Sequence, residues 1–185
     1  VGAAAINETP IYSSLINNKI GNLNAFEGDE RQIEKLKLKY KDSIKLFAEF
    51  LFDGSDQDLY LASPESGMSS LFKPNEKVLN FFNSFSHFGK ISEIKKIKTS
   101  KLDNIEKLPL IDFAKLDIQG SELTVLKNGN LKLAKCLAIQ VEVSYVCLYE
   151  NQPTFGEVDL WMRESGYTPH RFIDIKRWSI TPTIF

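Results

Sequence analysis

The segment Leu110–Ile118 reads LIDFAKLDI, and it carries one of the two strongest strand signals in the chain. The other lies at Cys136–Leu148, which reads CLAIQVEVSYVCL. Between them is Glu122–Asn128, a stretch of helical length, with Ser121 placed to cap it and Gly129 placed to end it. A strand, a helix and a second strand in this order predict a right-handed parallel crossover. The central sequence therefore predicts an α/β fold.

The rest of the chain alternates between strand and helix signals, without an internal repeat or a low-complexity linker, so we predict a single domain over residues 1–185. Strands are predicted at Asn22–Glu27, Ile44–Phe52, Asp58–Ala62, Ile91–Lys98 and Tyr167–Ile175. Helices are predicted at about Glu30–Tyr40, Asn75–Phe88 and Phe155–Gly166. Asp29, with Gln32 three residues later, is a variant of the capping box. We interpret the aromatic face of the second helix as core packing in preference to a lid.

Composition excludes several classes of protein. The 185 residues are 43% hydrophobic and 25% charged, as in a globular domain with a sizeable core. The 23 lysines and arginines against 24 acids give a net charge of -1, without the positive field of a nucleic-acid binder. Cys136 and Cys147 are too few for a disulfide framework, and no apolar run is long enough to span a bilayer. We expect a soluble cytoplasmic protein with neither a nucleic-acid nor a membrane partner.

Three carboxylates come at or near the ends of predicted strands, where parallel sheets bind their ligands, and a fourth interrupts an apolar strand. They are Glu27, Asp53, Asp117 and Glu142. Because Asp29 already fills the cap position of the next helix, Glu27 remains available to accept hydrogen bonds from the two hydroxyls of a ribose. Asp117 has a second interpretation, the closing of the turn that follows it. Glu142 could equally be a buried acid paired with a lysine or arginine.

Other motifs are weak or absent. The opening segment Val1–Ile6, VGAAAI, has the small residues of a loop that approaches a ligand closely, but its single glycine does not match the dinucleotide fingerprint G-x-G-x-x-G. A nicotinamide dehydrogenase is therefore not supported. His87 and His170 have no neighbours at ligand spacing, and we predict no metal site. The sequence has neither a P-loop nor a G-x-S-x-G elbow.

The segment Ile111–Lys127, IDFAKLDIQGSELTVLK, resembles the signature of the FkbM family of S-adenosylmethionine-dependent methyltransferases. The motif Val141-Glu142-Val143, followed by LYENQPTF at Leu148–Phe155, is similar to two further family motifs. Phe26-Glu27 and Asp53-Gly54-Ser55 also stand in the family's order, so the resemblance covers nearly the whole chain.

The resemblance implies a class I methyltransferase fold, which is Rossmann-like, with a mostly parallel central sheet and helices on both faces. It implies S-adenosylmethionine as the cofactor and a hydroxyl oxygen, on a sugar or other small-molecule or glycan precursor, as the methyl acceptor. Either Asp117 or Glu142 could remove the proton of the acceptor.

The resemblance also assigns roles to individual residues. Gly2 and Ala3 would lie under the methionine part of the cofactor, Glu27 would hold the ribose hydroxyls, and the region of Asp53 would border the adenine. Asp117 would face the amino group of the cofactor or the reacting centre. Glu142 would stand on the acceptor side, and Ser69 and Ser70 would help to cover the acceptor.

Two departures from the family pattern leave a rival interpretation open. Ile6 stands where a second glycine is expected, and the first and last strands of the family have little counterpart here. We interpret the sequence as truncated at one or both ends. The main alternative is a catalytically inactive methyltransferase-like domain that acts as a binding module. A nucleotide-sugar or dinucleotide enzyme rests on analogy of fold alone.

Overall fold

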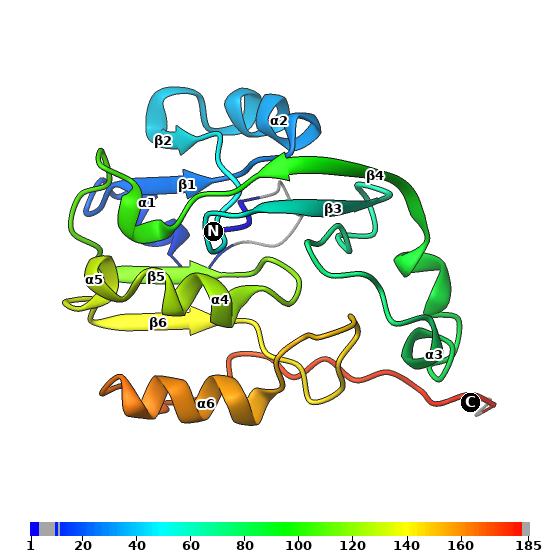
Figure 1. Cartoon of the computed structure of the whole chain (residues 1–185). Helices are drawn as coiled ribbons and strands as arrows, with labels where there is room; N and C mark the ends of the chain where they lie inside the picture. Colours follow the sequence, from blue (N-terminus) through cyan, green and yellow to red (C-terminus); the bar gives the residue numbers. More distant parts are fainter. Residues whose placement is uncertain (4–9, 11, 183–185) are drawn as a thin grey trace. The chain divides into compact units, whose positions relative to one another are not determined.

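A computed structural model of the chain describes residues 1–3, 10 and 12–182, and it shows a mixed α/β architecture (Figure 1). The strands are β1 Leu23–Phe26, β2 Ile44–Phe47, β3 Asp56–Ala62, β4 Ile91–Lys98, β5 Phe113–Leu116 and β6 Ala138–Val141. The α-helices are α1 Ser13–Asn17, α2 Glu30–Tyr40, α3 Glu76–Leu79, α4 Glu122–Lys127, α5 Asn130–Leu133 and α6 Phe155–Glu164. Short 3₁₀ turns are η1 Lys41–Ser43, η2 Ser86–Gly89 and η3 Leu102–Asn104.

The chain divides into two compact units. Unit 1 comprises Val1–Asp56, Ile97–Ile118 and Thr124–Val141. Unit 2 comprises Gln57–Lys96, Gln119–Leu123 and Glu142–Phe185. No helix among the described residues is long and apolar enough to cross a membrane.

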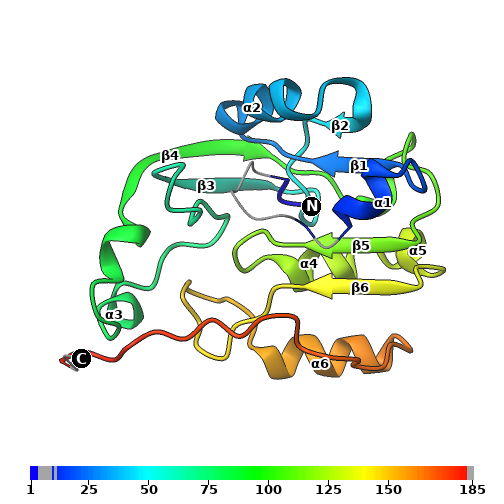
Figure 2. The same ribbon diagram turned by 180° about the vertical axis from the view of Figure 1, so that it is seen from behind.

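The strands of unit 1 form two parallel pairs. β1 pairs with β2 from Leu23↔Ile44 onward, and β5 pairs with β6 from Phe113↔Ala138 onward. All four strands point in the same direction in both views (Figures 1 and 2). The predicted parallel pairing of the two central strands is confirmed. As a result, the carboxyl ends of all four strands face the same side of unit 1.

Helix α2 connects β1 to β2 and begins at a well-formed cap. The carboxylate of Asp29 accepts a hydrogen bond from the main-chain N–H of Arg31 at 3.0 Å and pairs with the Arg31 guanidinium at 2.7 Å. Ile33 and Leu36 are buried on the inner face of the helix. The predicted helix and its cap residue are confirmed, although the Asp29 carboxylate accepts from Arg31 and not from Gln32 as a capping box requires.

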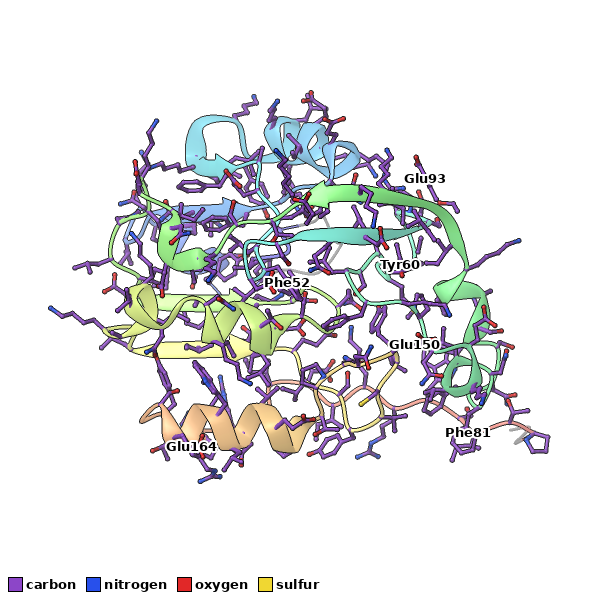
Figure 3. All side chains as sticks on the ribbon, in the orientation of Figure 1. Phe52, Tyr60, Phe81, Glu93, Glu150 and Glu164 are labelled. Atoms are coloured by element: carbon purple, nitrogen blue, oxygen red, sulfur yellow. The ribbon has the colours of Figure 1, made fainter. Side chains whose placement is uncertain are left out.

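Unit 2 contains most of the two-stranded sheet of β3 and β4, which run in opposite directions (Figure 1). β4 occupies the predicted range and is exposed along most of its length; Glu93 is one of its exposed side chains (Figure 3). The core of this unit is a buried cluster of Ala62, Met68, Leu79 and Tyr149. Phe85 and Phe88 pack against this cluster, in agreement with the interpretation of the aromatic face as core.

The predicted helix Asn75–Phe88 is wrong beyond its first turn. α3 ends at Leu79, and Ser84 has a φ of +51°, which no α-helix accommodates. The main-chain N–H of Asn83 donates to the carbonyl of Ser179 at 2.8 Å, and Phe82 forms a bridge with Ile180. Main-chain pairing with the C-terminal segment therefore replaces the hydrogen bonds that a longer helix would make.

Two strand predictions also need correction. The predicted strand Cys136–Leu148 is a strand only over β6, because the side-chain oxygen of Gln152 accepts the main-chain N–H groups of Leu148 at 2.7 Å and Tyr149 at 3.2 Å and folds this part into a loop. Residues 167–175 form no strand, since alternation of apolar residues makes a strand only where a neighbour completes the ladder. A single, mostly parallel central sheet stays a prediction.

Helix α6 gives a direct test of local stability. The Thr154 hydroxyl accepts from the Glu157 main-chain N–H at 3.4 Å, and the Glu157 carboxylate accepts from the Thr154 N–H at 2.8 Å, which makes a complete capping box. Thr154→Ala should lower the free energy of unfolding in urea by about 1 kcal/mol. Thr168→Ala, at an exposed position after the helix, should change it by less than about 0.5 kcal/mol. Equal effects of the two variants would contradict the role of the cap.

Candidate functional site

Glu27 follows the last residue of β1. Its main-chain N–H donates to the carbonyl of Phe47 at 3.1 Å, which fixes the end of the strand against β2. Its carboxylate accepts the main-chain N–H of Asp29 at 2.9 Å. Burial raises the pKa of Glu27, and the hydrogen bonds from the main-chain N–H groups of Asp29 and Gly28 only partly oppose this effect. The carboxylate is therefore poorly solvated, and additional hydrogen-bond donors would stabilise its charged form.

The backbone of Val1–Ala3 joins the ends of two strands. The Val1 nitrogen donates to the carbonyl of Lys115 at 2.7 Å, and the N–H of Asp117 donates to the carbonyl of Val1 at 3.3 Å. On the other side, the N–H of Ala3 donates to the carbonyl of Phe26 at 3.1 Å. The segment thus lies between the carboxyl ends of β5 and β1.

Gly2 is required by this arrangement. Its φ is +72°, and a Cβ at this position would lie 1.8 Å from the carbonyl oxygen of Asp117. Any side chain would push Val1–Ala3 away from β5. Residues 4–9, which include Ile6 and the rest of the small-residue loop, lie outside the described residues.

Asp117 comes directly after β5 and is ion-paired within its own strand. Its carboxylate accepts from the ammonium group of Lys115 at 2.8 Å, and the two side chains are 25% and 23% exposed. The Asp117 charge also contributes to the raised pKa of Tyr12, of which burial is the largest cause. Glu27, Asp117 and the Val1–Ala3 backbone therefore lie at one edge of unit 1.

Asp53 belongs to a turn in unit 1 that is closed by its own hydrogen bonds. Its carboxylate accepts the N–H of Ser55 at 2.9 Å and the Ser55 hydroxyl at 2.5 Å, and the latter bond is the main cause of its lowered pKa. The Thr99 hydroxyl holds the turn from the other side, where it donates to the carbonyl of Ser55 at 2.7 Å. The proposed contact of this region with adenine stays a prediction.

The residues assigned to the acceptor side lie in unit 2. Ser69 accepts the N–H of Ala62 at 3.1 Å, and the hydroxyl of the buried Ser70 donates to the carbonyl of Gln119 at 2.7 Å and accepts the N–H of Phe72 at 2.9 Å. Both hydroxyls therefore support the local fold. Their role toward an acceptor stays a prediction.

Glu142 is exposed, and a chain of side-chain hydrogen bonds orients it. Its carboxylate accepts from the side-chain amide of Gln119 at 3.0 Å. The amide oxygen of Gln119 in turn accepts from the hydroxyl of Tyr149 at 2.9 Å, and Tyr149 is only 1% exposed. Gln119 itself has a φ of +59°, an uncommon conformation for a residue other than glycine. The structure thus brings Glu142 together with buried groups that fix its position.

The sequence alone did not predict three residues that hold the candidate carboxylates Asp117 and Glu142, namely Lys115, Gln119 and Tyr149. Lys115 alone left a usable signal, because residues two apart in a strand share a face, so the order Lys115-Leu116-Asp117 predicts an ion pair. The role of Tyr149 depends on a contact across 30 positions of the chain, which no local pattern encodes.

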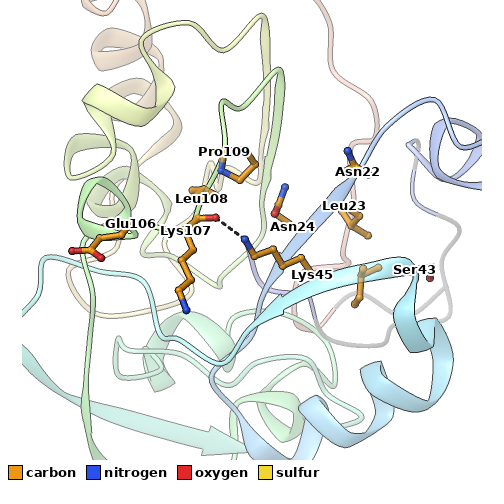
Figure 4. Close-up of a pocket in the computed structure, with 10 residues that line it drawn as sticks. Asn22, Leu23, Asn24, Ser43, Lys45, Glu106, Lys107, Leu108 and Pro109 are labelled. Carbon is orange, nitrogen blue, oxygen red and sulfur yellow. Dashed lines mark hydrogen bonds between the residues drawn. The ribbon is translucent and has the colours of Figure 1, made fainter.

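Two surface cavities lie away from the residues predicted for the site. The cavity in unit 1, of about 560 Å³, is at the amino ends of β1 and β2, where the Lys45 ammonium donates to the carbonyl of Lys107 at 2.6 Å (Figure 4). The cavity in unit 2, of about 570 Å³, is bordered by α3, η2 and β4. Neither cavity is lined by a residue predicted for the site.

Comparison with known families finds one family model that matches most of the chain. A family model described as Methyltransferase FkbM domain matches residues 3–169. No curated protein and no solved structure matches the chain. The matched range includes Glu27, Asp53, Asp117 and Glu142.

The raised pKa of the partly buried Glu27 carboxyl leads to a prediction about pH and stability. Because its pKa in the folded protein is raised above the ordinary value of 4.5, the unfolded chain loses this proton first as the pH rises, and ionised Glu27 costs stability at neutral pH. Glu27→Gln removes the charge and keeps an oxygen for the Asp29 N–H. We expect a higher urea midpoint than wild type at pH 7, and a difference that shrinks as the pH falls toward 4.5.

The matched control is Glu106→Gln, which neutralises an exposed carboxylate of the same unit and should leave the midpoint nearly unchanged at both pH values. A Glu27→Gln variant that is less stable than wild type at pH 7 contradicts the assignment of Glu27 as a strained, poorly solvated acid.

Proposed function

The chain belongs to the FkbM methyltransferase family, and we propose on this premise that it transfers the methyl group of S-adenosylmethionine to a hydroxyl oxygen of a sugar or other small-molecule or glycan precursor. The single observation that carries the cofactor assignment is Glu27, an acid held at the carboxyl end of β1 in a place where its charge is poorly solvated. Such a residue is costly to the fold, as functional groups often are.

The cofactor fits the chemistry of this edge. Two vicinal ribose hydroxyls would supply the donors that the Glu27 carboxylate lacks, and Asp29 is occupied in capping α2. At the end of β5, Asp117 and Lys115 together present an ion pair to a ligand. Gly2 and Ala3 would approach the methionine part through their backbone, since neither carries a side chain larger than a methyl group. S-adenosylmethionine, when bound, supplies a methyl group already activated by its sulfonium.

The residues of the chain then have two tasks, alignment and proton removal. Alignment of the acceptor hydroxyl with the cofactor would allow the methyl group to be transferred to its oxygen, and a carboxylate of the chain would take up the hydroxyl proton. The Asp117 carboxylate is already ion-paired with the Lys115 ammonium at 2.8 Å. Glu142 accepts from the side-chain amide of Gln119 at 3.0 Å and is exposed, so we propose Glu142 as the base.

Calorimetric titration with S-adenosylmethionine and S-adenosylhomocysteine tests the cofactor assignment. Wild type should bind both with micromolar affinity. Glu27→Ala should weaken both by at least about tenfold, because hydrogen bonds to a charged group are lost. Glu106→Gln, at the opposite edge of unit 1, should bind as wild type does. Unchanged affinity in Glu27→Ala would remove Glu27 from the site, and failure of the wild-type protein to bind would favour the inactive binding module.

A further inference from the structure

Lys115 and Asp117 form a close ion pair at the carboxyl end of β5. Their separation of 2.8 Å and their exposure of about one quarter place the pair partly out of water. They share one face of the strand because they are two residues apart. A ligand that approaches the Asp117 carboxylate therefore also meets the Lys115 ammonium group. The positive charge of Lys115 offsets much of the negative charge that such a ligand experiences.

This offset has a specific consequence for the two forms of the cofactor. S-adenosylmethionine carries a positive sulfonium, whereas S-adenosylhomocysteine carries a neutral thioether at the same place. The two ligands otherwise share their ribose, adenine and amino-acid groups. A lone carboxylate near the sulfur would favour the cation, and a carboxylate paired with an ammonium group would discriminate much less.

We propose that Lys115 sets the selectivity of the site between S-adenosylmethionine and S-adenosylhomocysteine by offsetting the charge of Asp117, an inference that rests on the proposed cofactor. The effect also serves the reaction. Sulfur loses its positive charge as its bond to the methyl carbon breaks and the carbon–oxygen bond forms, so an uncompensated carboxylate would stabilise the reactant more than the transition state. Lys115 reduces this ground-state stabilisation.

A purely structural role for Lys115 predicts a different result. Loss of packing or of strand geometry would weaken both ligands alike, because both would meet the same distorted edge. A change of charge acts on the cation and not on the neutral thioether. The ratio of the two dissociation constants therefore separates the two roles and needs no acceptor substrate.

The test is calorimetry with both ligands on wild type, Lys115→Met and Lys115→Arg. Lys115→Met should raise the ratio of the S-adenosylhomocysteine constant to the S-adenosylmethionine constant by about fivefold or more, since one unit charge is removed close to the sulfonium. Lys115→Arg keeps the charge and should leave the ratio within about twofold of wild type. The control Lys107→Met removes an exposed charge at the amino edge of unit 1 and should also leave the ratio unchanged.

Asp117→Asn and the double variant Lys115→Met/Asp117→Asn complete a double-mutant cycle. The test of the inference then does not depend on the folding of any single variant. Asp117→Asn should lower the ratio, and the double variant, in which the pair is again neutral, should return it to near the wild-type value. An unchanged ratio in Lys115→Met, or an equal change of both constants, overturns the inference while the cofactor assignment stands. A wild-type protein that binds neither ligand overturns both.

Discussion

The contact between Gly2 and the carbonyl oxygen of Asp117 is the constraint on which the candidate cofactor edge depends. Gly2 has a φ of +72°, and a Cβ at this position would lie 1.8 Å from the carbonyl oxygen of Asp117, so the position admits no side chain. The close approach lets Val1–Ala3 hydrogen-bond to the ends of β5 and β1 together. Glu27 and Asp117, which follow those two strands, are thereby held at the same edge of unit 1.

The two acids at this edge, Glu27 and Asp117, have opposite electrostatic surroundings. Glu27 is partly buried and, among the described residues, accepts from the main-chain N–H groups of Gly28 and Asp29, so its charge is costly until a ligand supplies hydroxyl groups. Asp117 has a cation at 2.8 Å, so its charge is offset before any ligand arrives. In unit 2, the exposed carboxylate of Glu142 accepts from the side-chain amide of Gln119.

Local signals predicted the local structure well. α2 and β4 follow from periodicity, and Asp29 from its position as a cap, because these features depend on neighbours in sequence. The failures involve contacts that the periodicity does not encode: Asn83 pairs with Ser179, and the side chain of Gln152 accepts the main-chain N–H groups of Leu148, the last residue of a predicted strand, and of Tyr149. Glu27 was predicted from its place at a strand end, and it does follow β1, whereas Gln119 was missed because its hydrogen bonds depend on Tyr149. The family signature predicted the methyltransferase family that the sequence match confirms.

A crystal structure of the protein with bound S-adenosylhomocysteine tests the central claim most directly. The account predicts the ligand at the carboxyl ends of β1 and β5, with both ribose hydroxyls within hydrogen-bond distance of the Glu27 carboxylate and the backbone of Gly2 against its amino-acid part. Binding in the cavity beside Lys45 at the amino ends of the strands, or a ribose without contact to Glu27, would contradict it.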